Sequence, residues 1–279
     1  MADVHPPIFL VRDAVRRALA EDMTPLGDMT ASLLTPEQHG RAGLVARDAG
    51  VVAGRLCAEE AFKQVDDTLR TTWRYDDGGE VTAGDVIGEV AGPLASILTA
   101  ERTALNFMCR LSGIASLTRR YVRAAKGNAR ILDTRKTTPG LRALEKAAVR
   151  AGGGANHRGS LSDFILIKDN HLGGMAIADA VRRARLQWPL RTVEVECDHI
   201  DQVREALEVR VDVIMLDNMT PPMVEEAVRI VAGACPVEVS GRVSLETVEA
   251  YAEAGANFIS VGALTHSAPI LDIALDLEP

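Results

Sequence analysis

The chain has 279 residues, 47% of them hydrophobic and 25% charged, and its 31 basic against 39 acidic residues give a formal net charge of -8. This acidity argues against a general nucleic-acid or anionic-membrane binder, and the aromatic content of only 4% argues against a base-stacking surface. Such a chain is typical of a globular protein with one large domain or two ordinary ones.

The N-terminal segment and the cysteines point to a reducing compartment. The first residues, MADVHPPIFLVRD, contain acids and prolines and lack the basic start and apolar run of a signal peptide. No apolar stretch reaches the ~18 residues that a membrane span needs. The four cysteines lie far apart, without the paired spacing of a zinc or redox motif. We therefore expect a cytoplasmic protein.

The first part of the chain mixes helical and strand patterns. A helix is predicted at 8–20, two glycine-broken pairs of strands at 43–54 and 80–92, a helix near 57–65, and a long helical region at 94–127. Gly113 is the expected break in the long helix. We interpret residues 1–110 as a mixed α+β domain.

The second part of the chain repeats a strand–helix unit. Its apolar runs are rich in β-branched residues and nearly continuous, as expected for strands buried on both faces. These runs lie at 129–134, 163–168, 191–197, 211–216, 235–240 and 256–261. In the first helical segment between them, Thr138 is a candidate cap and Pro139 stands at the first turn.

Six such repeats predict an α/β protein in which a parallel α/β barrel covers residues 111–266. The tail, residues 267–279, is expected to form a helix that packs back on the first domain.

Polar or small residues follow every predicted strand of the barrel, where its functional groups should gather. In chain order they are Arg135 and Lys136, Lys168, Glu196, Asp217, Ser240 and Gly241, and Gly262. Basic groups and isolated acids on one rim indicate a site for a substrate with several negative charges, with carboxylates for a hard metal or sugar hydroxyls.

Positive charge is concentrated in one segment, DTRKTTPGLRALEKAAVRAGGGANHRG, residues 133–159. This is unexpected because the whole chain carries a net negative charge. Its three glycines let backbone amides approach a ligand, and His157 and Arg158 follow them. Solvated side chains would explain these basic groups equally well. A structural ion pair between Lys168 and an acid would likewise explain that lysine, because a buried ammonium needs a partner or a function.

The long motifs of the chain resemble one known family. DTRKTTPGLRALEKAAVRAGGGANHR, LIKDNH, EVE, LDN and ISVGALTHSAPILDIALD, together with AEDMTPLGDMTASLL and LTAERTALNFMCRLSGIA, are similar to quinolinate phosphoribosyltransferases. The similarity covers nearly the whole chain. It implies an N-terminal α+β sandwich domain joined to an incomplete parallel α/β barrel, in a homodimer or larger assembly with shared active sites.

The resemblance also implies a reaction. These pentosyltransferases convert quinolinate and phosphoribosyl pyrophosphate, with Mg2+, into nicotinate mononucleotide, pyrophosphate and CO2 in de novo NAD synthesis. No general base is needed, because the ring nitrogen is itself the nucleophile. The enzyme would act by positioning and electrostatics.

The resemblance further assigns roles to individual residues. Arg135, His157, Arg158 and Lys168 would hold the carboxylates of quinolinate, with Arg102 entering from the partner subunit. Lys136 would face phosphoribosyl pyrophosphate. Glu196 and Asp217 would hold the ribose hydroxyls and Mg2+ and stabilise a cationic sugar. Ser240, Gly241, Gly262 and His266 would line the 5′-phosphate site. Arg242 departs from the Gly or Asn that many members have there.

Three other functions are compatible with parts of the pattern. A paralogous type II phosphoribosyltransferase, molybdenum-associated or nicotinate-specific, would share the fold, although the chain keeps LIKDNH. A barrel aldolase would form a Schiff base on a strand-end lysine such as Lys168. A binding protein without catalysis would not require Glu196 and Asp217 beside the cations.

Overall fold

The computed structural model describes residues 4–278, which form two compact units. The first unit contains residues 4–119, 137–153 and 264–278, and the second contains residues 120–136 and 154–263. This division differs from a single boundary near residue 110, because residues 137–153 belong to the first unit. None of the helices within 4–278 has the length and apolar character that crossing a bilayer requires.

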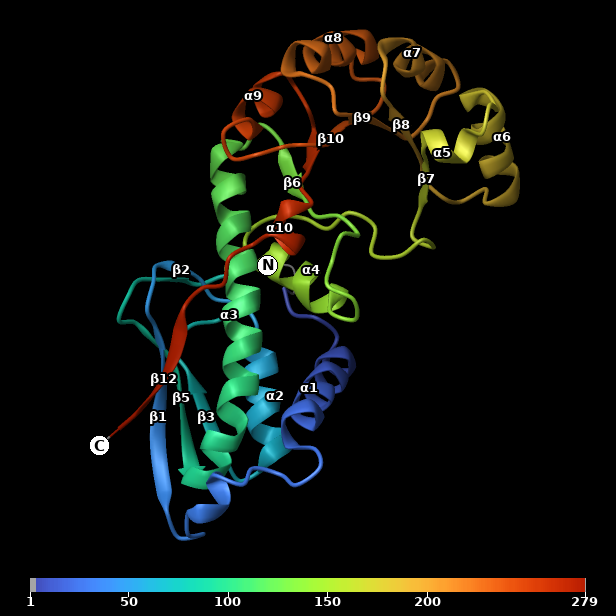
Figure 1. The fold of residues 1–279 in the computed structure, drawn as a ribbon. Coiled ribbons are helices and arrows are strands. Elements are labelled where there is room, and N and C mark those ends of the chain that lie inside the picture. The colour runs from blue at the N-terminus through green and yellow to red at the C-terminus, as the bar shows by residue number, and fades with distance from the viewer. Residues whose placement is uncertain (1–3, 279) are drawn as a thin grey trace. The chain divides into compact units, whose positions relative to one another are not determined.

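The first unit contains a four-stranded antiparallel sheet in the order β12–β1–β5–β3 (Figure 1). Its strands are β1 (His39–Ala46), β3 (Arg70–Trp73), β5 (Val86–Pro93) and β12 (Ile273–Leu277). A two-stranded ladder joins β2 (Gly50–Val51) and β4 (Glu80–Val81). The helices are α1 (Ile8–Met23), the short 3-10 turn η1 (Ala31–Leu33), α2 (Arg55–Val65), most of α3 (Leu94–Ala124) and α4 (Arg142–Ala151). The predicted mixture of helices and strands is confirmed for this part.

The tail was predicted wrongly as a helix over 267–279. Its described part contains strand β12, which pairs antiparallel with β1 and places Leu277 opposite Ala42. The physical reason is visible in the sequence, because Ile273, Leu275 and Leu277 alternate with smaller or charged residues at the period of a strand. Pairing with β1 also satisfies backbone groups that an isolated tail would leave to water.

The tail also explains Gly113, which does not break helix α3. A Cβ atom at Gly113 would lie only 2.0 Å from the backbone oxygen of Pro269. The glycine therefore lets the tail cross the helix at close range, and α3 continues without interruption from Leu94 to Ala124.

The second unit contains six parallel strands in the order β6–β11–β10–β9–β8–β7. They are β6 (Arg130–Leu132), β7 (Ile165–Ile167), β8 (Val193–Cys197), β9 (Val213–Asp217), β10 (Val237–Ser240) and β11 (Phe258–Ser260). All six predicted strands are confirmed. Within the described chain β6 and β7 end the ladder without pairing with each other, so the barrel is incomplete.

Helices cover the outer side of this curved sheet (Figure 1). They are α6 (Ile177–Gln187), α7 (Ile200–Glu208), α8 (Pro221–Val231) and α9 (Val248–Glu253). Two short helices are not part of this layer: α5 (Asp169–Leu172) follows β7, and α10 (Ala263–His266) follows β11 and belongs mostly to the first unit. In β8, Val193, Val195 and Cys197 are fully buried, as expected for strand residues that face covering helices. The alternate residues of each strand are then left to face the inside of the barrel.

The strand register aligns the carboxyl ends on one edge. Ser240 of β10 pairs with Asp217 of β9, and Glu196 of β8 pairs with Met215 of β9. The polar residues that end these strands are therefore neighbours, as the barrel prediction requires.

Candidate functional site

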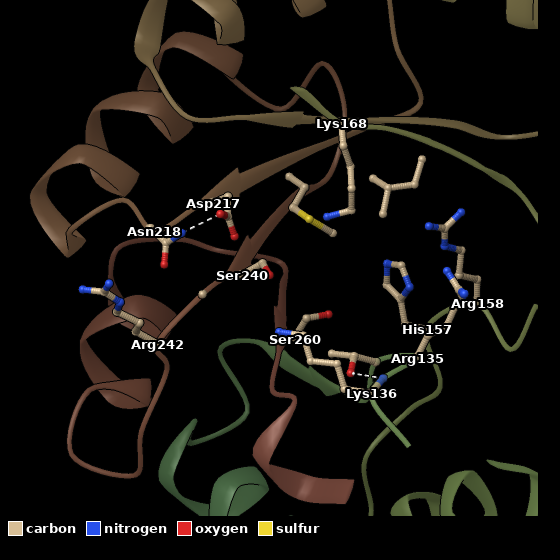
Figure 2. Close-up of a pocket in the computed structure, with 14 residues that line it drawn as sticks. Arg135, Lys136, His157, Arg158, Lys168, Asp217, Asn218, Ser240, Arg242 and Ser260 are labelled. Atoms are coloured by element: carbon tan, nitrogen blue, oxygen red, sulfur yellow. Dashed lines mark hydrogen bonds between the residues drawn. The ribbon is translucent and has the colours of Figure 1, made fainter. Parts of the chain in front are cut away.

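A cavity of about 590 Å3 lies within the second unit at the carboxyl ends of the strands (Figure 2). Its lining consists of strand-end residues and the loops that follow β6 and precede β7. The lining residues are Thr134, Arg135, Lys136, His157, Arg158, Leu166, Lys168, Met215, Asp217, Asn218, Ser240, Gly241, Arg242 and Ser260. The volume suits a small-molecule ligand.

Most of the predicted site residues meet in this cavity. Those that line it are Arg135, Lys136, His157, Arg158, Lys168, Asp217, Ser240 and Gly241. In Figure 2 the Lys168 side chain extends into the cavity, with His157 and Arg158 on one side and Asp217 and Ser240 on the other. The concentration of positive charge in residues 133–159 is thus partly explained, because Arg135, Lys136, His157 and Arg158 converge on one space.

Four predicted residues do not line the cavity. Glu196 and Gly262 belong to the second unit but are not part of the lining. Arg102 is exposed on helix α3, and His266 is exposed at the end of α10, with its Nδ1 atom 2.6 Å from Ser267 Oγ. Both of these belong to the first unit.

Several lining residues were not predicted as site residues. Met215 stands two positions before Asp217 on β9, Leu166 of β7 stands two positions before Lys168, which directly follows that strand, and Ser260 ends β11. The period of two along a strand was the signal that could have identified them. Arg242 lines the cavity, but it is exposed and its side chain points away from the cavity centre in Figure 2.

Lys168 forms an ion pair across two neighbouring strands. Its ammonium group donates a hydrogen bond to Oε2 of Glu196 on β8. Its backbone N–H donates to Nδ1 of His171, 3.0 Å away, in the first turn of α5. Burial raises the pKa of Glu196, while Lys168 opposes this shift and Asp217 adds to it. The ion pair that was one explanation of this lysine is therefore present, but the side chain is 38% exposed and not buried as expected.

The loop before β7 is fixed to the end of β6. Ala155 pairs with Leu132 in a parallel bridge, and its N–H donates to the oxygen of Ile131 at 2.8 Å. The fully buried Asp133 accepts the backbone N–H of His157 at 2.9 Å and the side-chain amide of Asn156 at 2.5 Å. These contacts, rather than the glycines alone, place His157 and the next residue at the cavity.

His157 lies against two buried glutamates. Its Nε2 atom is 3.2 Å from Oε2 of Glu194 on β8 and 3.4 Å from Oε1 of Glu238 on β10. The side chains of these glutamates are 1% and 3% exposed. Burial lowers the pKa of His157, but the two carboxylates outweigh burial and raise it to about 9. Burial likewise raises the pKa of Glu194, to about 7, against the effect of His157.

The same three side chains have the spacing of a metal site, with ligand atoms within 4.8 Å of one another. The two carboxylates also face the same ring nitrogen at ion-pair distance, so the three side chains form an ion-pair cluster when the imidazole is protonated. Neither glutamate was predicted. Each is a charged residue inside an apolar strand, two positions before a predicted site residue: Glu194 before Glu196, and Glu238 before Ser240. That combination was the signal that could have identified them.

Arg158 is positioned by an aromatic ring. Its guanidinium carbon lies 5.8 Å from the centre of the Phe164 ring, within cation–π range. Burial and the nearby Arg135 guanidinium lower the pKa of Arg158. Two guanidinium groups that repel each other at one edge of the cavity are well suited to an anion between them.

The opposite edge of the cavity is formed by the turns after β9 and β10. Asn218 adopts a left-handed φ of 54° and donates from its side chain to Asp217 Oδ2 at 2.5 Å. Gly241 has a φ of 90°, and a Cβ atom there would lie 2.4 Å from Oδ1 of Asn218. Glycine is thus required for the two turns to approach each other. Backbone amides in such turns can bind a phosphate.

The cavity can therefore bind an anion with more than one negative group. Arg135, Lys136, Arg158 and Lys168 supply fixed positive charge, and the fifth cation is His157. Asp217 supplies carboxylate oxygens in the lining. It lies close enough to Glu196 for its charge to raise the pKa of Glu196. Carboxylate oxygens suit Mg2+, which proteins often hold with one or two carboxylates together with substrate phosphates.

Comparison with known proteins identifies the family to which the chain is similar. The family model described as the C-terminal domain of quinolinate phosphoribosyl transferase matches residues 114–276, and the N-terminal domain model matches residues 28–112. A probable nicotinate-nucleotide pyrophosphorylase (carboxylating) of Bacillus subtilis is 42% identical over 90% of this chain and 88% of its own length. A quinolinate phosphoribosyltransferase (decarboxylating) of Nicotiana tabacum is 42% identical over 98% of this chain and 83% of its own length.

A solved structure gives the same result for the fold. The nicotinate-nucleotide pyrophosphorylase of Francisella tularensis superposes with a TM-score of 0.94 at 40% identity, covering 98% of both chains. The predicted fold class is thereby confirmed. On its two matched domain models, its relatives and its fold, the chain belongs to the quinolinate phosphoribosyltransferase family.

Proposed function

We propose that the protein transfers the phosphoribosyl group of phosphoribosyl pyrophosphate to quinolinate and releases pyrophosphate and CO2. The product is nicotinate mononucleotide, and the step belongs to de novo NAD synthesis. The observation that carries the proposal is the convergence of Arg135, His157, Arg158 and Lys168 on one cavity, in a chain whose relatives bear the names of this enzyme. A dicarboxylate with adjacent carboxylates needs such a set of cations.

The cavity residues would act mainly by orientation. Arg135, Arg158 and Lys168 bind the two carboxylates and direct the ring nitrogen toward C1 of the ribose. The nitrogen forms the new bond as the bond from C1 to the pyrophosphate oxygen breaks. Asp217 and Glu196 stabilise the positive charge that develops on the sugar. The 2-carboxylate then leaves as CO2, its bonding electrons pass into the cationic ring, and the ring carbon takes up a proton.

The other end of the cavity would receive the phosphorylated sugar. Ser240, Gly241 and the neighbouring Gly262 are proposed to bind the 5′-phosphate, with His266 beside them, and Lys136 to contact the pyrophosphate. The left-handed turn at Gly241, which exposes backbone at the cavity, supports this assignment.

Mg2+ is the proposed cofactor, and Asp217 and Glu196 are the residues that would hold it, directly or through ribose and water. When bound, it would neutralise negative charge on the pyrophosphate leaving group. Hard carboxylate oxygens at a cavity rich in cations fit this ion.

A homodimer or larger homo-oligomer with shared active sites completes the proposal. Arg102 would enter the cavity of the partner subunit, and its exposure on α3 supports this role. The cytoplasm is the proposed compartment, and the four free cysteines support a reducing one.

The deciding experiment compares quinolinate with nicotinate. The purified protein is incubated with phosphoribosyl pyrophosphate, Mg2+ and either acid, and nicotinate mononucleotide and CO2 are measured. We expect turnover of quinolinate with stoichiometric CO2, and its loss on chelation of Mg2+. Equal or better turnover of nicotinate would instead assign the protein to a nicotinate-specific branch, because one carboxylate would then suffice.

A further inference from the structure

Two buried glutamates lie next to the proposed substrate cavity without lining it. Glu194 and Glu238 line a second cavity, of about 320 Å3, near the amino ends of the barrel strands. His157 belongs to the lining of both cavities. The imidazole ring of His157 thus connects the glutamates with the substrate cavity, and through it they can influence a bound ligand.

We propose that Glu194 and Glu238 are positioning residues, which hold the His157 imidazole as an oriented cation facing the substrate carboxylates. The inference rests on the proposed function, since it concerns the same site. One ring nitrogen, Nε2, lies within ion-pair distance of both carboxylates, at 3.2 and 3.4 Å. Because the ring is rigid, attraction at this one nitrogen favours a single orientation of the whole ring, and His157 also lines the substrate cavity.

The surroundings of His157 make the two carboxylates the decisive partners. Glu194 faces the ring from β8 and Glu238 from β10, while Asp133 after β6 accepts the backbone N–H of His157. Before β7, the Phe164 ring contacts the imidazole edge-on, with centroids 5.0 Å apart. The adjacent Arg158 and the other cations of the cavity would favour a neutral imidazole. The negative charges of the two glutamates favour the protonated imidazole instead, and the raised pKa of His157 shows that their effect is the larger one.

A second contact holds the glutamate side of the cluster. Ser260 on β11 donates its hydroxyl to Oε1 of Glu238 at 2.5 Å. This fixes the carboxylate between two neighbouring strands, and Ser260 itself lines the substrate cavity. The expected consequence is that the cavity keeps its histidine cation across neutral and mildly alkaline pH, where an ordinary imidazole would have lost its proton.

The test uses Glu238→Gln, which keeps the shape and an acceptor for Ser260, and the double variant Glu194→Gln/Glu238→Gln. Glu60→Gln is the matched control, because Glu60 is a buried glutamate of the first unit. The His157 ring is followed by NMR from pH 5 to 10 and assigned with a His157→Gln protein. The wild type and the control should titrate near pH 9, Glu238→Gln clearly lower, and the double variant below the ordinary value of about 6.5.

Kinetics then separate charge from structure. In the double variant, KM for quinolinate at pH 8 should rise at least about 30-fold, because an imidazole with a pKa of about 6.5 or lower is then at most about 3% protonated. The increase should largely disappear at pH 6, with kcat little changed. Should the double variant fail to fold, Glu238→Gln should give a smaller increase of the same kind.

Three results would overturn the proposal: titration of wild-type His157 near 6.5, an unchanged midpoint in Glu238→Gln, or a KM defect equally large at pH 6 and pH 8. The NMR measurement involves no substrate. A wild type that does not turn over quinolinate would therefore contradict the proposed function without deciding the charge of His157.

Discussion

The Lys168 ammonium donates a hydrogen bond to the Glu196 carboxylate across the neighbouring strands β7 and β8. This pair joins a residue proposed to bind the substrate carboxylates to one proposed to stabilise the sugar cation. Substrate binding would compete for the ammonium, since a bound carboxylate and Glu196 attract the same group. The pair therefore links the two halves of the proposed reaction.

The first prediction follows from this pair. Lys168→Met removes the charge but keeps most of the side-chain volume, so the protein should fold. Loss of a charge-assisted contact should cost roughly 2–5 kcal/mol of transition-state stabilisation, or about 30-fold to several-thousand-fold in kcat/KM. Steady-state kinetics with quinolinate measure the loss, and thermal unfolding checks the fold.

Near wild-type turnover in Lys168→Met would remove this lysine from the site. The aldolase hypothesis predicts a different result: a carbonyl substrate would form an adduct on Lys168 that borohydride traps in the wild type. Mass spectrometry of the reduced protein tests for this adduct, and we expect none.

The second prediction concerns the proposed exchange of Arg102 between subunits. Arg102→Ala should keep its assembly state but lose quinolinate binding, because an exposed helix residue contributes little to folding. Mixed with an inactive Lys136→Ala protein, it should regain activity, since one site of each mixed dimer then contains both residues. Subunit exchange is verified by tagging the two proteins differently. Verified mixed dimers without any recovery would contradict a shared site.

The third prediction concerns the contact between Gly241 and Asn218. Gly241→Ala puts a methyl group 2.4 Å from the Asn218 side-chain oxygen, at a φ of 90°. Gly233→Ala is the matched control, because Gly233 has a φ of 79° but no atom within 4 Å of the added group. The control should lose about 1 kcal/mol from backbone strain alone.

Gly241→Ala should lose more than this control in urea unfolding and should raise KM for phosphoribosyl pyrophosphate, because the turn at the proposed phosphate site must move. Equal losses of stability and unchanged kinetics in both variants would show that the close approach is unimportant.

The fourth prediction is a pH dependence of stability caused by His157. Its pKa is about 9 in the folded protein and about 6.5 when unfolded. The stabilisation from the protonated ring is therefore fully present below pH 6.5 and is lost as pH rises through about 9. The free energy of unfolding should fall over this window by at most about 3 kcal/mol.

Glu194 lowers stability in the same direction, but over a lower pH range. Its pKa is raised to about 7, so its ionisation costs stability as pH rises through the range below that value. The contribution of His157 is thus measured above pH 7, by urea unfolding of the wild type and of His157→Gln. Identical slopes in the two proteins would contradict the assignment.

Much of the fold could be predicted because strands that are buried on both faces appear in the sequence as continuous apolar runs. The six barrel strands are of this kind, and the helices between them have regular spacing. The tail was predicted wrongly because a short run such as Ile273–Leu277 fits either a helix turn or an edge strand. Its partner β1 lies far away in the chain, and only pairing with it decides the outcome.

The sequence by itself determined which residue types end each strand, and hence that cations and carboxylates gather at one rim. Only the tertiary structure decided which of them share a cavity. Glu194 and Glu238 stand inside apolar strands of different repeats, and nothing local relates either to His157. They meet because the register pairs Glu194 with Val213 and Glu238 with Met215 of β9, which puts both glutamates on one face of the sheet, and because Asp133 fixes the loop that carries the histidine. Strand register arises from long-range pairing, so it cannot be deduced from the pattern of any single segment.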